Sequence, residues 1–290
     1  MDAMTRIERA LSAAVAHAER PGGPPLLARA MQHAVFPRGA RVRPRLCLAV
    51  ASACGDDHPA ASDAAAAAIE LLHCASLVHD DLPCFDDAAV RRGRASIHRA
   101  FGAPLAVLAG DALIVLAFET LARGAVDVPQ RMAALVATVG QSVGAPYGIV
   151  AGQAWESEDA IDLAAYQRAK TGALFAAATV AGAAAAGAAA PEAWRTLGER
   201  LGEAYQVADD LGDEVGDAAT LGKPVGQDCA HGRPNAALQL GVAGAVDRLG
   251  TLAREAVASI PPCAGSGELR ALILQEATRL MPKELAQSAA

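Results

Sequence analysis

The stretch that decides the fold spans residues 60–87 and reads AASDAAAAAIELLHCASLVHDDLPCFDD. Its first part is an apolar run of helix length that is rich in alanine, the best helix former. The run stops at Pro83, which cannot continue a helix, and four carboxylates surround that break. The stretch therefore predicts a buried helix over residues 60–82 with acidic side chains at its C-terminal end.

Helical periodicity extends along most of the chain, and strand alternation is hard to find. Pro44 fits the first turn of one further helix. Other helices are expected over residues 4–19, 26–35, 105–121, 130–154, 163–189, 192–215, 235–260 and 268–285. Residues 216–234, rich in glycine, proline and polar side chains, are long enough for a mobile flap. No interior linker looks like a domain boundary, so we predict an all-α protein with a single domain over residues 1–290.

Composition narrows the possible classes. The 290 residues are 53% hydrophobic and 20% charged, which allows a sizeable core and excludes a disordered chain. The formal net charge of −7 comes without a clustered basic face, so no nucleic-acid partner is expected. The N-terminus lacks the apolar core of a signal peptide, and the six scattered cysteines favour reduced thiols. We therefore expect a cytoplasmic protein.

One uncharged stretch, residues 172–190, has the length of a membrane span. It consists mostly of alanine and glycine, and Lys170 and Glu192 flank it tightly. A buried core helix is the better interpretation, so we expect no transmembrane segment.

A second acidic cluster lies in residues 205–213, which read YQVADDLGD. Asp209 and Asp213 are spaced i, i+4, so a continuous helix places both on one face. In the first cluster, the break at Pro83 lets Asp86 return toward Asp80. Carboxylates at a helix C-terminus repel one another and the macrodipole, so a cation should compensate them. A single cluster of this kind is usually a solvated helix end, but two clusters, each after an apolar run, favour Mg²⁺ sites.

Basic residues accompany both clusters. Three arginines follow the first cluster, three surround Pro44, and two lysines lie next to glycines: Arg91, Arg92, Arg94, Arg41, Arg43, Arg45, Lys170 and Lys223. A single arginine is usually a surface charge, but arginine forks match phosphate oxygens in a bidentate manner. Acidic clusters for magnesium together with separate basic groups predict a bound diphosphate, and the apolar helices upstream predict a greasy remainder of the substrate.

With its two aspartate motifs, residues 80–93 (DDLPCFDDAAVRRG) and 209–213 (DDLGD), the chain resembles the trans-isoprenyl diphosphate synthases from about residue 27 to residue 260. The likeness is greatest to bacterial geranylgeranyl diphosphate synthases of carotenoid and bacteriochlorophyll pathways. The resemblance implies an isoprenoid synthase fold of ten or more helices around a central cavity, within one polyprenyl synthetase domain. It also implies a homodimer and three Mg²⁺ ions per active site.

The same resemblance assigns roles to individual residues. It implies metal binding by Asp80, Asp81, Asp86, Asp209 and Asp213, and a catalytic set that adds Lys170, Thr171, Gln206 and Asp210. It implies an allylic diphosphate site at Arg91, Lys170, Thr171, Gln206 and Lys223, and an isopentenyl diphosphate site at Arg43, His73 and Arg92. His73 alone would more often be an interior histidine, but it lies two helical turns before Asp80 on the same face.

Two positions depart from the family pattern. Ala40 stands where the family has a lysine of the isopentenyl site, so that site has one cation fewer unless Arg38 or Arg41 substitutes for it. Gln227 stands where the family has a second lysine of the late glycine–lysine pattern. Both changes concern isopentenyl binding and flap closure rather than metal chemistry.

Product length should follow the depth of the cavity. In the resembled family, the residue five positions before the first aspartate helps to form the floor beneath the growing tail, and that residue is Ala75 here. Ser76 is its neighbour, and Leu72 lies nearly one turn deeper, where it can contribute to the final stop. Because one helical turn rises ~5.4 Å, about one isoprene unit, small side chains leave room for a further unit. We predict condensation of isopentenyl diphosphate with dimethylallyl, geranyl or farnesyl diphosphate to give geranylgeranyl diphosphate.

Several alternatives remain open at this point. The same reaction could stop at farnesyl diphosphate or continue to longer chains. A terpene cyclase shares the metal-clamped diphosphate but usually carries an asparagine-and-glutamate second motif. A regulatory subunit without catalysis is compatible with Ala40 and Gln227, although such subunits tend to lose an aspartate motif. A helical scaffold without chemistry explains the core but not the paired aspartates.

Overall fold

The structure, a computed structural model, describes residues 1–19, 22–36, 39–215 and 235–280, apart from the side chains of Asp213, Val215 and Leu280. These residues are mostly helical, which confirms the predicted all-α class. The α-helices are α1 (Ala3–Ala18), α2 (Pro25–Val35), α3 (Val42–Ala53), α4 (Pro59–Asp80), α5 (Ile97–Phe101), α6 (Ala103–Gly124), α7 (Pro129–Val143), α8 (Ile149–Ala154), α9 (Leu163–Gln167), α10 (Ala173–Ala185), α11 (Arg195–Val215), α14 (Ala236–Ala258) and α15 (Ser266–Leu280). The expected flap, with Lys223 and Gln227, and also Arg38 lie outside the described residues.

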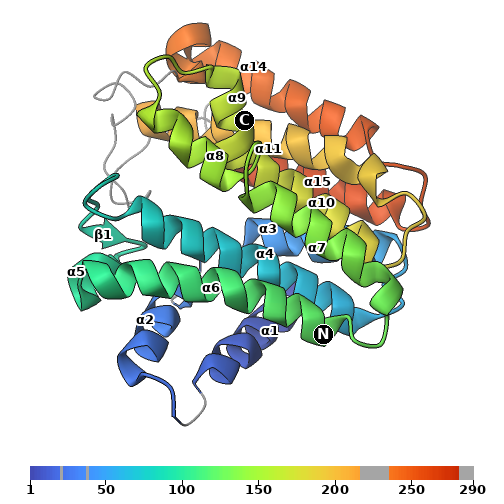
Figure 1. Cartoon of the computed structure of the whole chain (residues 1–290). Coiled ribbons are helices and arrows are strands. Elements are labelled where there is room, and N and C mark those ends of the chain that lie inside the picture. The colour runs from blue at the N-terminus through green and yellow to red at the C-terminus, as the bar shows by residue number, and fades with distance from the viewer. Residues whose placement is uncertain (20–21, 37–38, 216–234, 281–290) are drawn as a thin grey trace.

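Helix α4 lies at the centre of the molecule and packs against α6, α3 and α10 (Figure 1). Its alanine-rich first half is buried on all sides, as the sequence predicts. Helices α1 and α2 pack against α4 and α6 on one side of the molecule. Helices α11, α14 and α15 lie on the other side, beyond α10 and α3. At Gly182 of α10, an added Cβ atom would lie 2.2 Å from the Cys47 carbonyl oxygen of α3, so only glycine permits this close approach.

Three of the expected helices are interrupted, and the one over residues 235–260 has a kink at Gly241, where φ is 71°. The predicted helix over residues 130–154 is wrong, because α7 ends at Val143 and α8 begins at Ile149. Pro146 lies in the gap, where its ring and missing N–H oppose a continuous helix. The predicted helix over residues 163–189 ends four residues early and contains the π turn η2 (Arg168–Gly172) between α9 and α10. Such a turn inside a helix is often found at functional sites.

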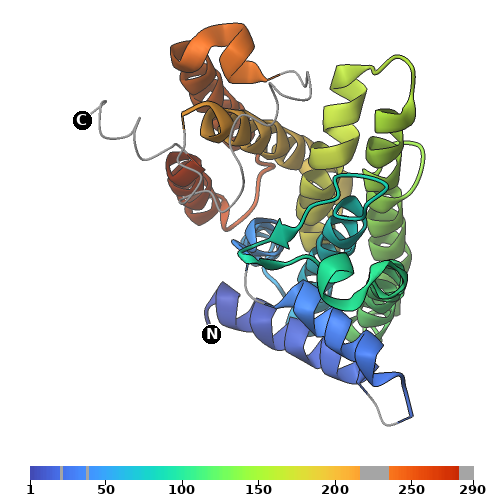
Figure 2. The same ribbon diagram turned by 90° about the vertical axis from the view of Figure 1, so that its left-hand side faces the viewer.

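Short elements complete the fold. A two-stranded antiparallel hairpin pairs β1 (Val90–Arg91) with β2 (Arg94–Ala95) and leads into α5. The 3₁₀ turn η1 (Trp155–Ser157) directly follows α8, and the 3₁₀ turn η3 (Pro191–Trp194) directly precedes α11. Figure 2 shows the hairpin and α5 together at one end of α4 and α6. This end of α4 carries the first acidic cluster.

The apolar helices are explained mainly by the core. Helix α10 covers most of the uncharged stretch 172–190 and is buried along its length, which agrees with a core helix. Among the described residues, α4 and α6 are long and apolar enough to cross a membrane, with 78% and 44% of the tested windows buried. A helix of this kind is weak evidence for a membrane span, and α4 is fully explained as the central core helix.

Candidate active site

The first acidic cluster forms where α4 ends. Asp80 is the last residue of the helix, and the chain then turns so that the Asp86 N–H donates to the Asp80 carbonyl oxygen at 3.0 Å. Asp86 therefore does return to Asp80 across the break at Pro83, as the sequence predicts. Asp87 points elsewhere: it accepts two hydrogen bonds from Arg99, at 3.1 and 3.2 Å.

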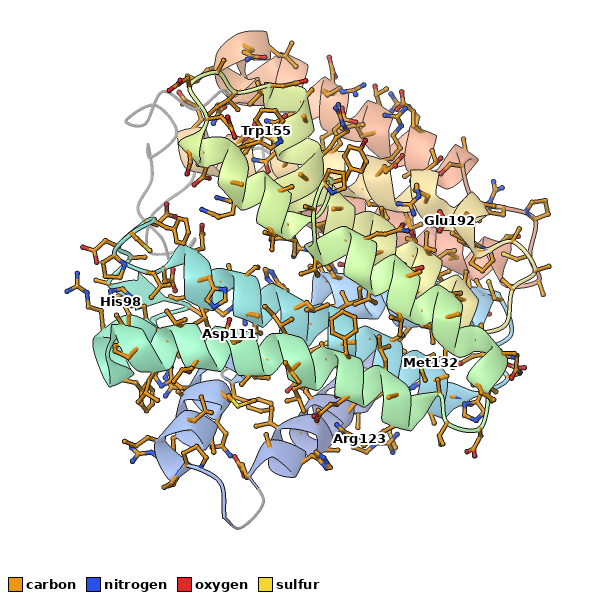
Figure 3. All side chains as sticks on the ribbon, viewed as in Figure 1. His98, Asp111, Arg123, Met132, Trp155 and Glu192 are labelled. Atoms are coloured by element: carbon orange, nitrogen blue, oxygen red, sulfur yellow. The ribbon has the colours of Figure 1, made fainter. Side chains whose placement is uncertain are left out.

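A third carboxylate, Glu156, completes this cluster. Oxygen atoms of Asp80, Asp86 and Glu156 all lie within 4.8 Å of one another. Glu156 belongs to η1 at the end of α8, where Figure 3 marks the preceding residue Trp155. Its two oxygens are held in place by the Tyr166 hydroxyl at 2.8 Å and by Gln153 Nε2 at 2.9 Å. Hard oxygen donors at this spacing fit a magnesium ion.

Sequence reasoning missed Glu156. It is one of several acids in the stretch WESEDAID, which has the ordinary pattern of a solvated segment and no aspartate doublet. Only the fold brings it to Asp80, because Gly152 lets α8 lie against the π turn. An added Cβ atom at Gly152 would lie 2.5 Å from the Lys170 backbone nitrogen.

Lys170 supplies a positive charge to this cluster. Its Nζ lies 3.3 Å from Asp80 Oδ1 and also donates to Glu156 Oε1. Burial alone would lower the pKa of Lys170, but Asp80, Tyr166 and Glu156 raise it above its ordinary value. Burial raises the pKa of the Asp80 carboxyl, and the nearby Asp86 adds to this rise, while Lys170 opposes it. Among the described residues, the three carboxylates of this cluster face the positive charges of Lys170 and, 3.7 Å from Asp80, of Arg91.

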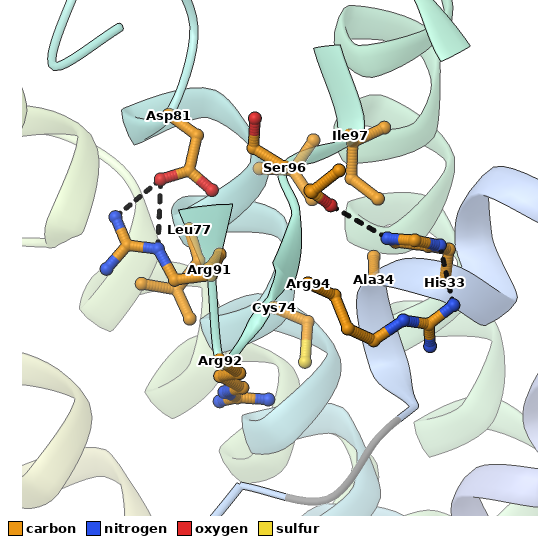
Figure 4. A pocket seen from close by; sticks show the side chains of 12 residues that line it. His33, Ala34, Cys74, Leu77, Asp81, Arg91, Arg92, Arg94, Ser96 and Ile97 are labelled. Carbon is orange, nitrogen blue, oxygen red and sulfur yellow. Dashed lines mark hydrogen bonds and ion pairs between the residues drawn. The ribbon is translucent and has the colours of Figure 1, made fainter. Parts of the chain in front are cut away.

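Asp81 makes a different contact. It is only 2% exposed and accepts from Arg91 Nε at 2.9 Å and from Arg91 Nη2 at 2.5 Å (Figure 4). Burial raises the pKa of Asp81, and the bonds from Arg91 offset part of that rise. Arg91 also lies 3.7 Å from Asp80 Oδ2, so the hairpin holds one arginine beside both members of the doublet. The pocket in Figure 4 lies next to this ion pair, between α2, α4 and the hairpin.

Two partly buried arginines, Arg43 and Arg92, lie near the part of α4 that precedes the cluster. The Arg43 guanidinium lies 4.5 Å from the centre of the Phe175 ring, and Arg92 Nη2 is 3.8 Å from Glu70. Arg43 Nε and Arg92 Nη1 are buried, and neither has a hydrogen-bond partner among the described residues. A buried donor without a partner is costly, so these two atoms indicate a place for an anion.

His73 lies close to both of these arginines. Burial lowers the pKa of His73 well below 6.5, and the charges of Arg43 and Arg92 lower it further. A neutral imidazole can donate one hydrogen bond to an anion without adding charge. The structure thus brings together the three residues that the resemblance assigns to isopentenyl diphosphate.

Arg41 does not replace the missing lysine at Ala40. Its buried guanidinium bonds Glu70 at 2.6 Å and Glu8 at 3.0 Å, and it donates to the Val35 carbonyl at 2.8 Å. This charge is therefore committed to an internal ion pair between α1, α3 and α4.

The second acidic cluster lies on α11, which runs as α-helix to Val215. Asp209 is half-buried there, and Asp213 lies one turn further along the helix. Gln206 Nε2 donates to Asp210 Oδ1 at 2.9 Å, and the Thr171 hydroxyl donates to Gln206 Oε1 at 3.0 Å. Asp210 itself is 2% exposed.

The π turn η2 connects the two clusters. Its consecutive residues Lys170 and Thr171 make opposite contacts: Lys170 bonds Asp80 of the first cluster, and Thr171 bonds Gln206 of the second. The end of α4 is thus linked to Gln206 of α11 through two neighbouring side chains.

The residues assigned to product length lie on the buried side of α4. Ala75 and Leu72 are each 1% exposed, and the Ser76 hydroxyl donates to the His73 carbonyl at 2.8 Å. All three lie one to two turns before Asp80, on the inner part of the helix that carries the cluster.

Comparisons with known proteins agree with this geometry. A model of the polyprenyl synthetase family matches residues 24–256. A geranylgeranyl diphosphate synthase of Cereibacter sphaeroides is 57% identical over 97% of both chains, and one of Rhodobacter capsulatus is 54% identical over 95% of both.

Solved structures give the same answer. A geranyltransferase of Helicobacter pylori, complexed with magnesium and isoprenyl diphosphate, matches with a TM-score of 0.81 and 27% identity, over 95% of this chain and 96% of the other. A synthase of farnesyl or geranylfarnesyl diphosphate from Zymomonas mobilis matches with a TM-score of 0.78 and 29% identity, over 94% of this chain and 98% of the other. Because the family match covers most of the chain and includes both aspartate clusters, the chain belongs to the polyprenyl synthetase family.

Proposed function

We propose that this chain is a geranylgeranyl diphosphate synthase that condenses isopentenyl diphosphate with dimethylallyl, geranyl or farnesyl diphosphate. The observation that carries this proposal is the arrangement of charge at the end of α4. Asp80, Asp86 and Glu156 offer carboxylates for a metal, and two buried arginine atoms, Arg43 Nε and Arg92 Nη1, have no hydrogen-bond partner among the described residues. One diphosphate could bind through metal ions held by the carboxylates, and a second could bind directly to the arginines. This arrangement suits a reaction between two substrates that each carry a diphosphate.

The acidic residues fit Mg²⁺, and three ions per site is the number that the family resemblance implies. Asp80, Asp86 and Glu156 would hold magnesium on the α4 side, and Asp209 and Asp213 would hold it on the α11 side. When bound, magnesium would neutralise charge on the departing diphosphate. The H. pylori relative is described as a complex with magnesium and isoprenyl diphosphate, which supports this ion.

The chain's own residues perform the remaining tasks. Lys170 and Arg91, together with Lys223, pair with the allylic diphosphate and stabilise the negative charge that grows as it leaves. The oxygen atoms of Thr171 and Gln206 lie together at 3.0 Å and favour the positive charge that develops on the allylic carbon.

On the other side, Arg43 and Arg92 bind isopentenyl diphosphate, and neutral His73 donates a hydrogen bond to it. The isopentenyl double bond then attacks the allylic carbon, and a proton is lost to the released diphosphate.

The residues assigned to product length support a product of twenty carbons. Ala75 and Ser76 are small, so the tail can extend past them along α4 toward Leu72. The two relatives that match over nearly the whole chain are both called geranylgeranyl diphosphate synthases.

We further propose a homodimer in the cytoplasm, with one polyprenyl synthetase domain over residues 1–290 and a place in carotenoid synthesis. Exposed apolar side chains on α6 support the dimer: Val107, Leu108 and Val115 are 42%, 52% and 58% exposed. Side chains of this kind on one helix are typical of a surface that another subunit covers.

One assay tests the proposed activity. Purified protein is incubated with Mg²⁺, labelled isopentenyl diphosphate and each allylic starter in turn, and the products are sized by chromatography. We expect a twenty-carbon product with at least one starter. A fifteen-carbon product would identify a farnesyl diphosphate synthase, and no product with any starter would identify a non-catalytic subunit.

A further inference from the structure

The Asp210 side chain lies at the junction of α11 with the start of α14. It is 2% exposed. Its Oδ2 accepts the Ala236 backbone N–H at 2.8 Å, and its Oδ1 accepts from Gln206 Nε2 at 2.9 Å. Its backbone carbonyl accepts from Asn235 Nδ2 at 3.2 Å. Within the part of the chain that the structure describes, each carboxylate oxygen thus accepts from a neutral donor.

The bond to Gln206 fixes the direction of an amide. A carboxylate can only accept hydrogen bonds, so Gln206 must turn its Nε2 toward Asp210. Its Oε1 then faces Thr171, whose hydroxyl donates to it at 3.0 Å. If Gln206 were reversed, its Oε1 would face the Asp210 carboxylate, and two acceptors would repel each other. Asp210 therefore decides that an oxygen, and not an NH₂ group, lies beside Thr171 and Lys170.

The bond to Ala236 fixes a helix end. Ala236 is the first residue of α14, and Asn235 caps the helix by accepting from the N–H groups of Ala237 and Leu238, at 2.8 and 3.2 Å. A carboxylate at this point also interacts favourably with the positive end of the helix dipole. Asp210 thus joins the start of α14 to the π turn through one chain of hydrogen bonds.

We propose that Asp210 is a positioning residue rather than a metal ligand: it orients Gln206 so that the Gln206 oxygen faces the developing allylic cation, and it anchors α14 beside the site. This inference deepens the proposed function, because it concerns how that reaction's cation is stabilised. It predicts that the two aspartates of the doublet in α11 have different roles: Asp209 binds the metal, and Asp210 orients Gln206.

The first test is Asp210→Asn, which has the same shape. The Asn oxygen can still accept from Ala236, so its NH₂ group would face Gln206 and turn that amide around. The NH₂ group of Gln206 would then point at the developing cation. We expect kcat to fall about 10²- to 10³-fold, the order of losing one preorganised dipole. KM for both diphosphates and the Mg²⁺ concentration that gives half-maximal rate should stay within about twofold, whereas Asp80→Asn should raise the latter strongly.

The second test is rescue by a charge swap. In Asp210→Asn/Gln206→Glu the net charge is unchanged, the new Glu accepts from the new Asn, and an oxygen again faces Thr171. We expect this double variant to recover at least about a tenth of the wild-type kcat, while Gln206→Glu alone, which sets two carboxylates against each other, should be worse than the double variant. A double variant below that level, whether from lost activity or lost folding, overturns the proposal. So does an Asp210→Asn protein with wild-type kcat or with the Mg²⁺ dependence of Asp80→Asn.

A third measurement does not depend on activity. Amide hydrogen exchange should be faster at residues 236–240 in Asp210→Ala than in the wild type, and unchanged in Asp209→Ala. Equal exchange in Asp210→Ala and the wild type contradicts the anchoring role. A wild-type protein without prenyltransferase activity would overturn the proposed function, while the exchange result would still decide whether Asp210 anchors α14.

Discussion

The two aspartate clusters look alike in the sequence but differ in the structure. The first lies where α4 is broken at Pro83, so Asp86 folds back onto Asp80. The second lies on α11, whose helix continues through Asp213, so the register of the helix decides where each side chain points. In both doublets the second aspartate is 2% exposed, but Asp81 is bound by the charged Arg91 and Asp210 by neutral amides. Similar motifs therefore place their second aspartates in different surroundings.

The sharpest way to break this comparison is Asp80→Asn. We expect turnover to fall by about 10³-fold or more, because this carboxylate is one of the three proposed metal ligands on the α4 side (the metal set) and also contacts Lys170. Since burial raises the pKa of Asp80, its charge costs stability, and the melting temperature should be unchanged or higher. Steady-state kinetics and thermal melts measure both effects. Asp87→Asn, which changes a neighbouring carboxylate outside the set, is the matched control and should keep most of the activity.

A smaller loss is expected for Glu156→Gln. This change removes one charge from the three carboxylates and keeps one acceptor oxygen, which can still accept from Tyr166 or from Gln153, while the new NH₂ group can only donate. We expect the apparent affinity for Mg²⁺ to fall about 10- to 100-fold, and the rate at saturating Mg²⁺ to fall less. A magnesium titration of the initial rate measures this effect. Glu158→Gln, an exposed acid of the same segment, serves as control, and equal results for the two variants would remove Glu156 from the metal set.

The two aspartate clusters are proposed to bind the diphosphate of the substrate. A substitution near the hydrocarbon tail should therefore leave the difference between the clusters unchanged. Ala75→Tyr should shift the main product from twenty to fifteen carbons while the Mg²⁺ dependence stays as in the wild type. Because Ala75 is 1% exposed, the larger ring should also cost about 1–3 kcal/mol of folding stability. Chromatography of the products measures the shift, with Ser76→Ala as control. Unchanged products in a folded Ala75→Tyr protein would refute the hypothesis that residue 75 helps to form the floor beneath the growing tail.

The smallest effect concerns His73, which faces the arginines near the first cluster. The pKa of His73 is lowered in the folded protein, so the unfolded chain binds its proton first as the pH falls below about 6.5. Folding stability is therefore complete above this pH and declines below it, with a slope of at most about 1.4 kcal/mol per pH unit from this residue. Denaturant melts between pH 7.5 and 5 should show a shallower decline for His73→Gln. An identical decline in both proteins would mean that His73 is protonated in the folded state.

Several of these features could be predicted from the sequence because they are local. The alanine-rich run fixes the position of α4, and Pro83 fixes its end and the return of Asp86. The break between α7 and α8 was also visible at Pro146, but the apolar periodicity on both sides of it suggested one helix. The hairpin strands have two residues each, too few to show alternation.

Other features depend on contacts between distant parts of the chain. Glu156 reaches Asp80 only because α8 lies against the π turn, and nothing in its own segment indicates this contact. Arg41 looks like a candidate for the diphosphate until Glu70 and Glu8 are seen to bind it. The burial of Asp210 depends on the start of α14, 26 residues further along the chain. A motif shows which residues are acidic, but only the packing shows which of them face the substrate.

One measurement tests the difference between the clusters most directly. Crystals grown with Mn²⁺ in place of Mg²⁺, and with a thio analogue of dimethylallyl diphosphate that does not ionise, would place the metal by its anomalous scattering. The account predicts Mn²⁺ bound by Asp80 and Asp86, and none within about 2.5 Å of an Asp210 oxygen. Mn²⁺ coordinated by Asp210, or no Mn²⁺ between Asp80 and Asp86, would contradict it.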